Sequence, residues 1–350
     1  MQRLISADRV EMSSRKKVAV ICGGQSPEHE ISCLSGLGIF AAIDRTKFEA
    51  ILLGIATDGS RFIALNERAD FESDVNALPT VPKRGSFAEI PPDVDLLFPI
   101  LHGTNGEDGV FQRYAEDRGF NYVGSGISAS AIAMDKSIAK EVFRRSGLVT
   151  APGVIVEKSE RSKGAWRSLR YPLFVKPARG GSSRGTVKVK VEAEMESALD
   201  LAFRFDETVL VEEAVIGREI ECGILVENGE VTSSVVGEIR VLGGREFYDY
   251  EAKYLDNATQ YLVPAPVDES LSQKIREQAI VAFKAVGCEG FARVDFFLKE
   301  SGEVVINEIN TLPGFTPKSV FPMLWKASGK SYEEVVSVLI EEALARPKSS

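Results

Sequence analysis

Residues 291–310 read FARVDFFLKESGEVVINEIN. Two apolar runs flank a short polar link that contains a glycine, a pattern that predicts a β-hairpin. Side chains alternate along a strand, so Arg293 and Asp295 share one face of the first strand. Glu308 and Asn310 share one face of the second strand for the same reason. The hairpin therefore predicts a face with two carboxylates, one amide oxygen and one guanidinium.

This polar face has the composition of a metal site. Carboxylate and amide oxygens without histidine or cysteine suit Mg²⁺ or Mn²⁺, which usually keeps waters and substrate phosphates as further ligands. The alternative interpretation is a solvated strand face held by salt bridges. The apolar neighbours weaken that alternative, because polar groups inside an apolar hairpin cost free energy unless they bind something. These neighbours are Phe296, Phe297, Val305 and Ile306.

The rest of the chain predicts three domains. Strand and helix patterns alternate over the first third, which argues for a parallel sheet with helices on its faces. Two α+β units follow, and a length of 350 residues allows this number of domains. We predict a disordered extension at residues 1–16, an α/β domain at 17–133, and α+β domains at 134–214 and 215–350.

The strands are expected at residues 17–22, 50–65 (two strands around a turn at 58–59), 94–101, 173–177, 186–191, 208–215, 220–226, 231–239, 291–298 and 303–310. The helices are expected at residues 32–43, 106–118, 130–145, 193–205, 270–286 and 332–345, and residues 66–93 are expected to be a surface excursion.

Composition excludes several classes of protein. The chain has 44% hydrophobic and 27% charged residues, an ordinary globular balance. Its net charge of -9 does not suit a protein that coats nucleic acid, and its apolar runs are too short for a membrane helix. The 4 cysteines form no C-x-x-C pair, and there are only 2 histidines. We expect a cytoplasmic protein without disulfides or a zinc site.

A second informative stretch is KPARGGSSRG, residues 176–185. Glycines beside serines and a lysine suit a loop whose backbone N–H groups approach phosphate. It is not a Walker A loop, because no Gly-Lys-Ser/Thr sequence opens a helix here. On these residues alone, a flexible cover over a nucleotide and an ordinary mobile hairpin are equally well supported.

Two loops of the first domain follow expected strands, at the edge where open α/β sheets bind ligands. In GGQSPE, residues 23–28, Glu28 either meets a substrate ammonium group or caps the next helix. In HGTNGEDG, residues 102–109, His102 is either a structural residue or part of the site. Lys136, on a later helix, is either an ordinary surface lysine or directed at a nucleotide.

Taken together, the motifs resemble those of the D-alanine–D-alanine ligase family of ATP-grasp enzymes, over about residues 17–345. They occur in the family's order: GGxSxE at 23–28, HG…GEDG at 102–109, MDK at 134–136, KP…GSS at 176–183, FYDYEAKY at 247–254, RVD at 293–295 and EINTxPG at 308–314. The resemblance implies a three-domain ATP-grasp fold with ATP between the last two domains. It also implies a closing loop at about residues 240–261.

The resemblance implies roles for the matching residues around ATP. Lys136, Lys176, Gly181, Ser182, Ser183 and the loop residue Lys253 would hold or cover phosphates; Glu212, Val215 and Glu219 would take the adenosine; and Asp295, Glu308 and Asn310 would bind two Mg²⁺ or Mn²⁺ ions. One departure concerns the adenine. Glu213 is acidic where some relatives have lysine, which puts side-chain help at the adenine in doubt.

Further roles are implied around the amino acids. Glu28 would take the ammonium group of a first D-alanine, linked by hydrogen bonds to Ser182 and Tyr254, with His102 also on the substrate. Ser319 and the neighbouring backbone N–H of Val320 would hold the carboxylate of a second D-alanine. Arg293 and the backbone N–H of Gly314 would stabilise the tetrahedral oxyanion.

The implied activity is ATP-dependent formation of D-alanyl-D-alanine through a D-alanyl phosphate, with ADP and phosphate as the other products. Such a dipeptide serves peptidoglycan synthesis, and the resemblance suggests a homodimer. The resemblance also implies a dipeptide rather than an ester with D-lactate, because Tyr254 within YEAKY is similar to the loop of dipeptide-forming relatives. One alternative is another ATP-grasp carboxylate–amine ligase, for example with D-serine as acceptor. A second is a non-catalytic nucleotide- or amino-acid-binding module. Such a module could lose Arg293 or a metal ligand without penalty, yet here the set is complete.

Overall fold

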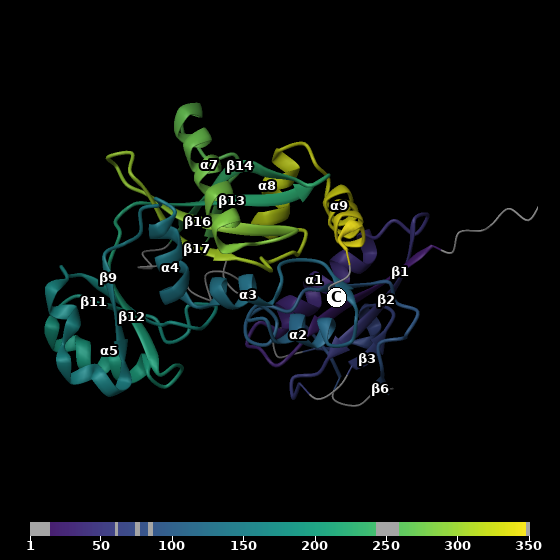
Figure 1. The fold of residues 1–350 in the computed structure, drawn as a ribbon, viewed down its shortest axis with the longest axis horizontal. Helices are drawn as coiled ribbons and strands as arrows, with labels where there is room; N and C mark the ends of the chain where they lie inside the picture. The colour runs from purple at the N-terminus through teal and green to yellow at the C-terminus, as the bar shows by residue number, and fades with distance from the viewer. Residues whose placement is uncertain (1–14, 60–61, 74–77, 83–86, 243–258, 348–350) are drawn as a thin grey trace, which may run out of the picture.

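The computed structural model describes residues 15–59, 62–73, 78–82, 87–242 and 259–347. These residues form three main β-sheets with helices packed on them (Figure 1). Most of the expected extension and most of the expected closing loop, with Lys253 and Tyr254, lie outside the described residues. Within the described ranges, no helix has the length and apolar character needed to cross a membrane.

The first sheet has the strand order β6-β3-β2-β1-β7-β8. Its central strand β1 pairs in parallel with β2 and β7, while β3 pairs antiparallel with β2. The strands are β1 (Lys16–Gly23), β2 (Phe48–Ile55), β3 (Phe62–Leu65), β6 (Phe87–Ala88), β7 (Leu96–Pro99) and β8 (Asn121–Tyr122), with helices α1 (His29–Ala42) and α2 (Val110–Glu116). Residues 18–22 of β1 are fully buried, as expected for a strand covered on both faces.

The second sheet is antiparallel, with the order β11-β10-β12-β9. Its strands are β9 (Gly153–Glu157), β10 (Leu173–Pro177), β11 (Val187–Val189) and β12 (Thr208–Glu213), and helix α5 (Met195–Ala202) packs on it. Its own small core includes Trp166, Val175 and Leu199. The glycine-rich stretch connects β10 to β11, as the sequence predicts.

The third sheet is also antiparallel, with the order β15-β14-β13-β16-β17. Its strands are β13 (Arg218–Glu227), β14 (Glu230–Val241), β15 (Thr259–Leu262), β16 (Phe291–Leu298) and β17 (Val304–Asn310), with helices α7 (Glu269–Val286), α8 (Val320–Ala327) and α9 (Tyr332–Ala345). The predicted hairpin is confirmed, because β16 and β17 are register partners. The register shifts between Asp295 and Phe296, which leaves Asn307 as an extra residue in β17.

The first and third sheets share a hydrophobic core. Phe315, which follows the end of β17, is fully buried in it. Its ring lies 6.3 Å from Phe98 of β7 and 5.7 Å from Phe291 of β16, centroid to centroid. Helix α9 also packs against the first sheet, beside α1 in Figure 1. This shared core fixes the last strands of the third sheet against the loops of the first.

The secondary structure departs from the expectations in three ways. The single helix at residues 130–145 is two helices, α3 (Ile127–Met134) and α4 (Lys136–Arg145). Asp135 separates them because its carboxylate accepts hydrogen bonds from the backbone N–H of Ser137 and Ile138, which caps α4. Strand β9 and helix α8 do not appear among the expected elements. Residues 66–93 are not only a surface excursion, since they contribute the buried Phe71, Val81 and Ile90.

Small strands and turns complete the structure. Strands β4 (Glu72–Ser73) and β5 (Pro79–Thr80) pair with each other, and short 3-10 helices lie at Arg68–Asp70, Lys158–Lys163, Ala165–Ser168 and Glu192–Glu194. The main sheets occupy residues 16–122, 153–213 and 218–310. The domain boundaries given above stay predictions.

Candidate active site

A cavity of about 770 Å³ opens between the three sheets. It is lined by almost every candidate residue that the sequence singles out: Glu28, His102, Lys136, Lys176, Gly181, Ser182, Ser183, Glu212, Val215, Glu219, Arg293, Asp295, Glu308, Asn310, Gly314, Ser319 and Val320. Lys253 and Tyr254 lie outside the described residues. Segments far apart in the chain therefore meet at one site.

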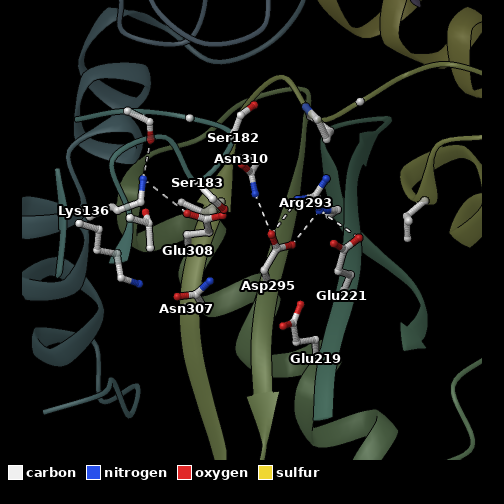
Figure 2. Close-up of a pocket in the computed structure, with 18 of the residues that line it drawn as sticks. Lys136, Ser182, Ser183, Glu219, Glu221, Arg293, Asp295, Asn307, Glu308 and Asn310 are labelled. Atoms are coloured by element: carbon white, nitrogen blue, oxygen red, sulfur yellow. Dashed lines mark hydrogen bonds and ion pairs between the residues drawn. The ribbon is translucent and has the colours of Figure 1, made fainter. Parts of the chain in front are cut away.

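Arg293 is fixed at the centre of the cavity wall by carboxylates (Figure 2). Its Nε and Nη2 donate to the two oxygens of Asp295, each at 2.7 Å. Glu221 Oε2 of the neighbouring strand β13 lies 3.1 Å from the same Nε. Burial opposes the charge on Arg293, but these carboxylates outweigh it and raise its pKa well above the usual value. Arg293 is therefore a permanent, rigidly held cation.

Asp295, Glu308 and Asn310 gather on one face because of the β16–β17 register. Asp295 is directly opposite Glu308, and Asn310 Nδ2 donates to Asp295 Oδ2 at 3.0 Å. The bulge adds Asn307 to the cavity lining beside Glu308 (Figure 2). Hard oxygen ligands on one face of the sheet fit Mg²⁺ or Mn²⁺, and an open cavity in front leaves room for water and phosphate ligands.

Lys136 connects this acidic face to the glycine-rich loop. As the first residue of α4, it reaches across the cavity and donates to the backbone oxygen of Gly180 at 2.7 Å. Its Nζ also lies 3.6 Å from Glu308 Oε2. Of the two interpretations of Lys136, the structure excludes the ordinary surface lysine, since only 17% of its side chain is exposed.

The glycine-rich loop has an unusual backbone at its serines. Ser182 and Ser183 both have positive φ, 53° and 55°, a conformation rare for residues other than glycine. Successive backbone N–H groups in such conformations form concave anion-binding sites. Gly181 lies against Glu28, since a β-carbon added there would be 3.1 Å from Glu28 Oε2. The loop thus approaches the carboxylate of the first domain, a contact that a bulkier residue would crowd.

Two lysines share the carboxylate of Glu212, at the end of β12. Lys176 of β10 contacts Glu212 Oε1, and Lys140 of α4 lies 2.7 Å from Oε2. Burial opposes ionisation of Glu212, but the two ammonium groups outweigh it and lower its pKa to about 2. Glu213, the departure noted above, forms a separate ion pair at 2.9 Å with Arg170.

The first sheet supplies the wall around Glu28. His102 is buried, and its Nδ1 lies 2.9 Å from the backbone oxygen of Leu312, in the loop after β17. Glu107 accepts hydrogen bonds from the backbone N–H of Gly103, at 2.6 Å, and of Leu312, at 3.3 Å. Burial, then the nearby charge of Glu28, raises the pKa of Glu107 to about 8.

Ser319, at the start of α8, also lines the cavity. Its Oγ accepts a hydrogen bond from the backbone N–H of Thr316 at 3.1 Å, which closes a tight turn before the helix. The first N–H groups of a helix have no partner within the helix and favour an anion. Ser319 and Val320 therefore offer a place for a carboxylate.

Sequence reasoning missed four residues of this site: Glu107, Lys140, Glu221 and Asn307. Glu221 could have been predicted, since it lies two residues after Glu219 and so shares its strand face. Glu107 stands inside a quoted motif, but nothing local predicts its contact with Leu312. Asn307 needs the bulge, and Lys140 needs the packing of α4 on β12. These depend on tertiary structure.

Comparison with known proteins places the chain in a family. Residues 17–125 match the family model for the D-ala D-ala ligase N-terminus, and residues 142–341 match that for the D-ala D-ala ligase C-terminus. This chain belongs to the D-alanine–D-alanine ligase family. A D-alanine–D-alanine ligase of Mycolicibacterium paratuberculosis is 43% identical to it, over 95% of this chain and 98% of the relative.

Solved structures of this ligase family agree with the fold. The VanG D-Ala:D-Ser ligase of Enterococcus faecalis has a TM-score of 0.81 and 36% identity, over 94% of this chain and 99% of its own. The D-alanine–D-alanine ligase of Coxiella burnetii has a TM-score of 0.79 and 33% identity, over 94% of each chain. The D-alanine–D-alanine ligase family has the ATP-grasp fold, so the predicted fold class is confirmed.

Proposed function

We propose that this chain joins two D-alanine molecules into D-alanyl-D-alanine at the expense of ATP, with ADP and phosphate as products. One observation carries the proposal. A single cavity combines a loop suited to phosphate, Gly181–Ser183, with the carboxylate of Glu28 and the acidic face of Asp295 and Glu308. A ligase that activates an amino acid carboxylate with ATP needs these parts together.

The chemistry has two steps. A carboxylate oxygen of the first D-alanine attacks the γ-phosphorus of ATP, and the bond to ADP breaks, which gives D-alanyl phosphate. The free amine of the second D-alanine then attacks the acyl carbon and loses a proton, and phosphate leaves. Activation is necessary because the oxygen of a free carboxylate is a very poor leaving group.

The nucleotide lies between the second and third sheets in this proposal. Lys136 and Lys176 neutralise phosphates, which is the main task of a phosphoryl-transfer site. The loop residues Gly181, Ser182 and Ser183 cover the phosphates, together with Lys253. The adenosine is bound by Glu212, Val215 and Glu219. Asp295, Glu308 and Asn310 would hold two Mg²⁺ or Mn²⁺ ions, which when bound neutralise developing charge on the phosphate oxygens.

The amino acids lie deeper, against the first domain. Glu28 binds the ammonium group of the first D-alanine, in a hydrogen-bonded group with Ser182 and Tyr254, beside His102. Ser319 and the N–H of Val320 hold the carboxylate of the second D-alanine, and this places its amine toward the acyl phosphate. Orientation of this kind removes much of the entropic barrier to reaction between two bound molecules.

Arg293 and the N–H of Gly314 stabilise the negative oxygen of the tetrahedral intermediate. Arg293 suits this role because Asp295 holds its Nε and Nη2, so its orientation is fixed before the reaction. A prearranged donor of this kind contributes about 3 kcal/mol to the stabilisation of a transition state. Closure of residues 240–261 over the cavity would keep water from the acyl phosphate.

The proposal extends to the organisation of the protein. We propose the domain boundaries 17–133, 134–214 and 215–350, a homodimeric assembly, and a role for the product in peptidoglycan synthesis. A D-serine acceptor is the second candidate, because the structural neighbour from Enterococcus faecalis is named a D-Ala:D-Ser ligase.

Isotope transfer tests the acyl phosphate. With D-alanine labelled with ¹⁸O in its carboxylate, one labelled oxygen should appear in each phosphate released as dipeptide forms. Unlabelled phosphate would contradict the proposed intermediate.

Competition between D-alanine and D-serine at equal concentrations, with both products measured by mass spectrometry, should give mainly D-alanyl-D-alanine. A predominance of D-alanyl-D-serine would favour the second candidate.

A further inference from the structure

Lys140 is a buried lysine to which the proposed reaction gives no role. It lies one turn of α4 beyond Lys136, and only 2% of its side chain is exposed. Its Nζ lies 2.7 Å from Glu212 Oε2, while Lys176 contacts the other oxygen of the same carboxylate. The two lysines approach Glu212 from different elements, α4 and β10.

Lys140, Lys176 and Glu212 together carry one net positive charge. Lys176 and Glu212 line the cavity, whereas Lys140 is not among its lining residues. One lysine would neutralise Glu212, and burying a second ammonium group costs free energy unless something compensates it. The ammonium closer to the cavity is that of Lys176. The excess charge is therefore presented to whatever anion enters.

We propose that Lys140 is a positioning residue for nucleotide binding, which neutralises Glu212 from behind and so leaves the Lys176 ammonium available to the phosphates of ATP. This inference rests on the proposed use of ATP but not on the identity of the amino acids. Without Lys140, both oxygens of Glu212 compete with the phosphates for Lys176. Lys140 acts through its charge and touches no substrate.

The ionisation of Glu212 supports this account. The low pKa of Glu212 keeps it ionised throughout the neutral range, although burial opposes this. Burial lowers the pKa of Lys140 below its ordinary value, although the charge of Glu212 opposes this. The pair Lys330–Glu227, at 2.7 Å, offers a comparison, because it contains one lysine for one carboxylate and neither residue lines the cavity.

The test measures nucleotide binding alone, by calorimetry on the full chain with Mg²⁺ and no amino acid. Lys140→Met should raise the Kd for the non-hydrolysable analogue AMP-PNP about 10-fold, the size expected from one lost charge interaction near phosphates. The Kd for adenosine, which has no phosphate, should change much less. Lys140→Gln, which can still donate a hydrogen bond to Glu212, should behave in the same way. Lys330→Met is the matched control and should leave both Kd values unchanged.

A second substitution provides the decisive arm. Adding Glu212→Gln to Lys140→Met removes the negative charge beside Lys176. The three positions 140, 176 and 212 then carry one net positive charge, as in the unsubstituted protein. Because Glu212 is also proposed to bind the adenosine, the readout is the ratio of the Kd for AMP-PNP to the Kd for adenosine. This ratio should return toward that of the unsubstituted protein, which simple damage to packing does not predict. Melting temperatures of all variants show whether each has folded.

Two results would overturn the inference. One is an unchanged Kd for AMP-PNP in both folded Lys140 variants. The other is a loss of AMP-PNP affinity that adenosine shares equally, or a ratio of the two Kd values that does not recover in the double variant. Either result, with normal AMP-PNP binding by the unsubstituted protein, leaves the proposed function intact. No AMP-PNP binding by the unsubstituted protein would instead refute the use of ATP, and the role of Lys140 with it.

Discussion

Asp295 and Glu308 are register partners across the pair formed by β16 and β17, with their side chains on the cavity face. Two carboxylates this close repel each other unless cations lie between or beside them. Arg293 and Lys136 supply part of that charge from within the chain. The negative charge that these two cations leave uncompensated makes this face suitable for divalent ions.

The first prediction concerns this carboxylate pair. Glu308→Gln should lower kcat more than about 100-fold, because metal-ion stabilisation of phosphoryl transfer is worth several kcal/mol. The variant should also need a higher Mg²⁺ concentration for half-maximal rate. Glu303→Gln, an exposed carboxylate on the same hairpin, is the control and should leave both quantities unchanged. A Glu308→Gln variant with a normal Mg²⁺ requirement would contradict the assignment.

The second prediction concerns Arg293. Arg293→Lys keeps the positive charge but loses the two-pronged contact with Asp295. Its kcat should fall about 100-fold, as for removal of one prearranged oxyanion donor, while the KM for ATP changes little. Steady-state kinetics with varied ATP separates the two effects. Arg276→Lys on α7, whose guanidinium bonds Ser233, should leave kcat unchanged. A similar loss in both variants would point to a general effect on folding.

The third prediction is a pH dependence of stability that comes from Glu107. Burial and Glu28 raise its pKa to about 8 in the folded chain, from an ordinary value of 4.5. The folded state therefore binds more protons than the unfolded state between these values, so stability falls as pH rises through this window. Glu107→Gln removes the titration. We expect the unsubstituted protein to lose about 4 kcal/mol relative to this variant between pH 5 and pH 9.

Denaturant unfolding of both proteins at several pH values measures this difference. The Glu300→Gln substitution, at an exposed position, provides the reference. A constant gap between Glu107→Gln and the unsubstituted protein would show that Glu107 does not titrate in this range.

The fourth prediction concerns the core behind the site. Phe315→Ala removes a fully buried ring that packs against Phe98 and Phe291, and should lower the free energy of unfolding by about 3–5 kcal/mol. Because Phe315 follows Gly314 directly, activity should fall as well, even under conditions where the variant stays folded. Leu201→Ala, at a more exposed position, should cost less than about 1 kcal/mol. Equal losses in the two variants would contradict a special role for this core.

The elements that could be predicted from sequence are those with a strong local pattern. The alternation in β16 and β17 predicts both the hairpin and the shared polar face, and α9 begins and ends where its pattern does. The break between α3 and α4 escaped, because the apolar spacing continues through Asp135 and only its capping contacts reveal the interruption. The burial of Lys140 was not predicted either, since a lysine on a short helix is usually exposed.

The site could be predicted in outline but not in its connections. The motif residues meet in one cavity, as expected, because the loops, strands and helix starts that carry them border the same space. The contact of His102 with Leu312 joins positions far apart in the chain, and no local pattern encodes it. Packing of the first and third sheets around Phe315 supplies that information instead.

The most direct test of the proposed activity measures phosphate release from Mg-ATP with D-alanine as the only amino acid, together with identification of the product. L-Alanine, D-lactate and D-serine, each supplied alone, are the parallel reactions. We predict phosphate release that depends on D-alanine, with one D-alanyl-D-alanine formed for each phosphate. Tight ATP binding without turnover of D-alanine would contradict the ligase account.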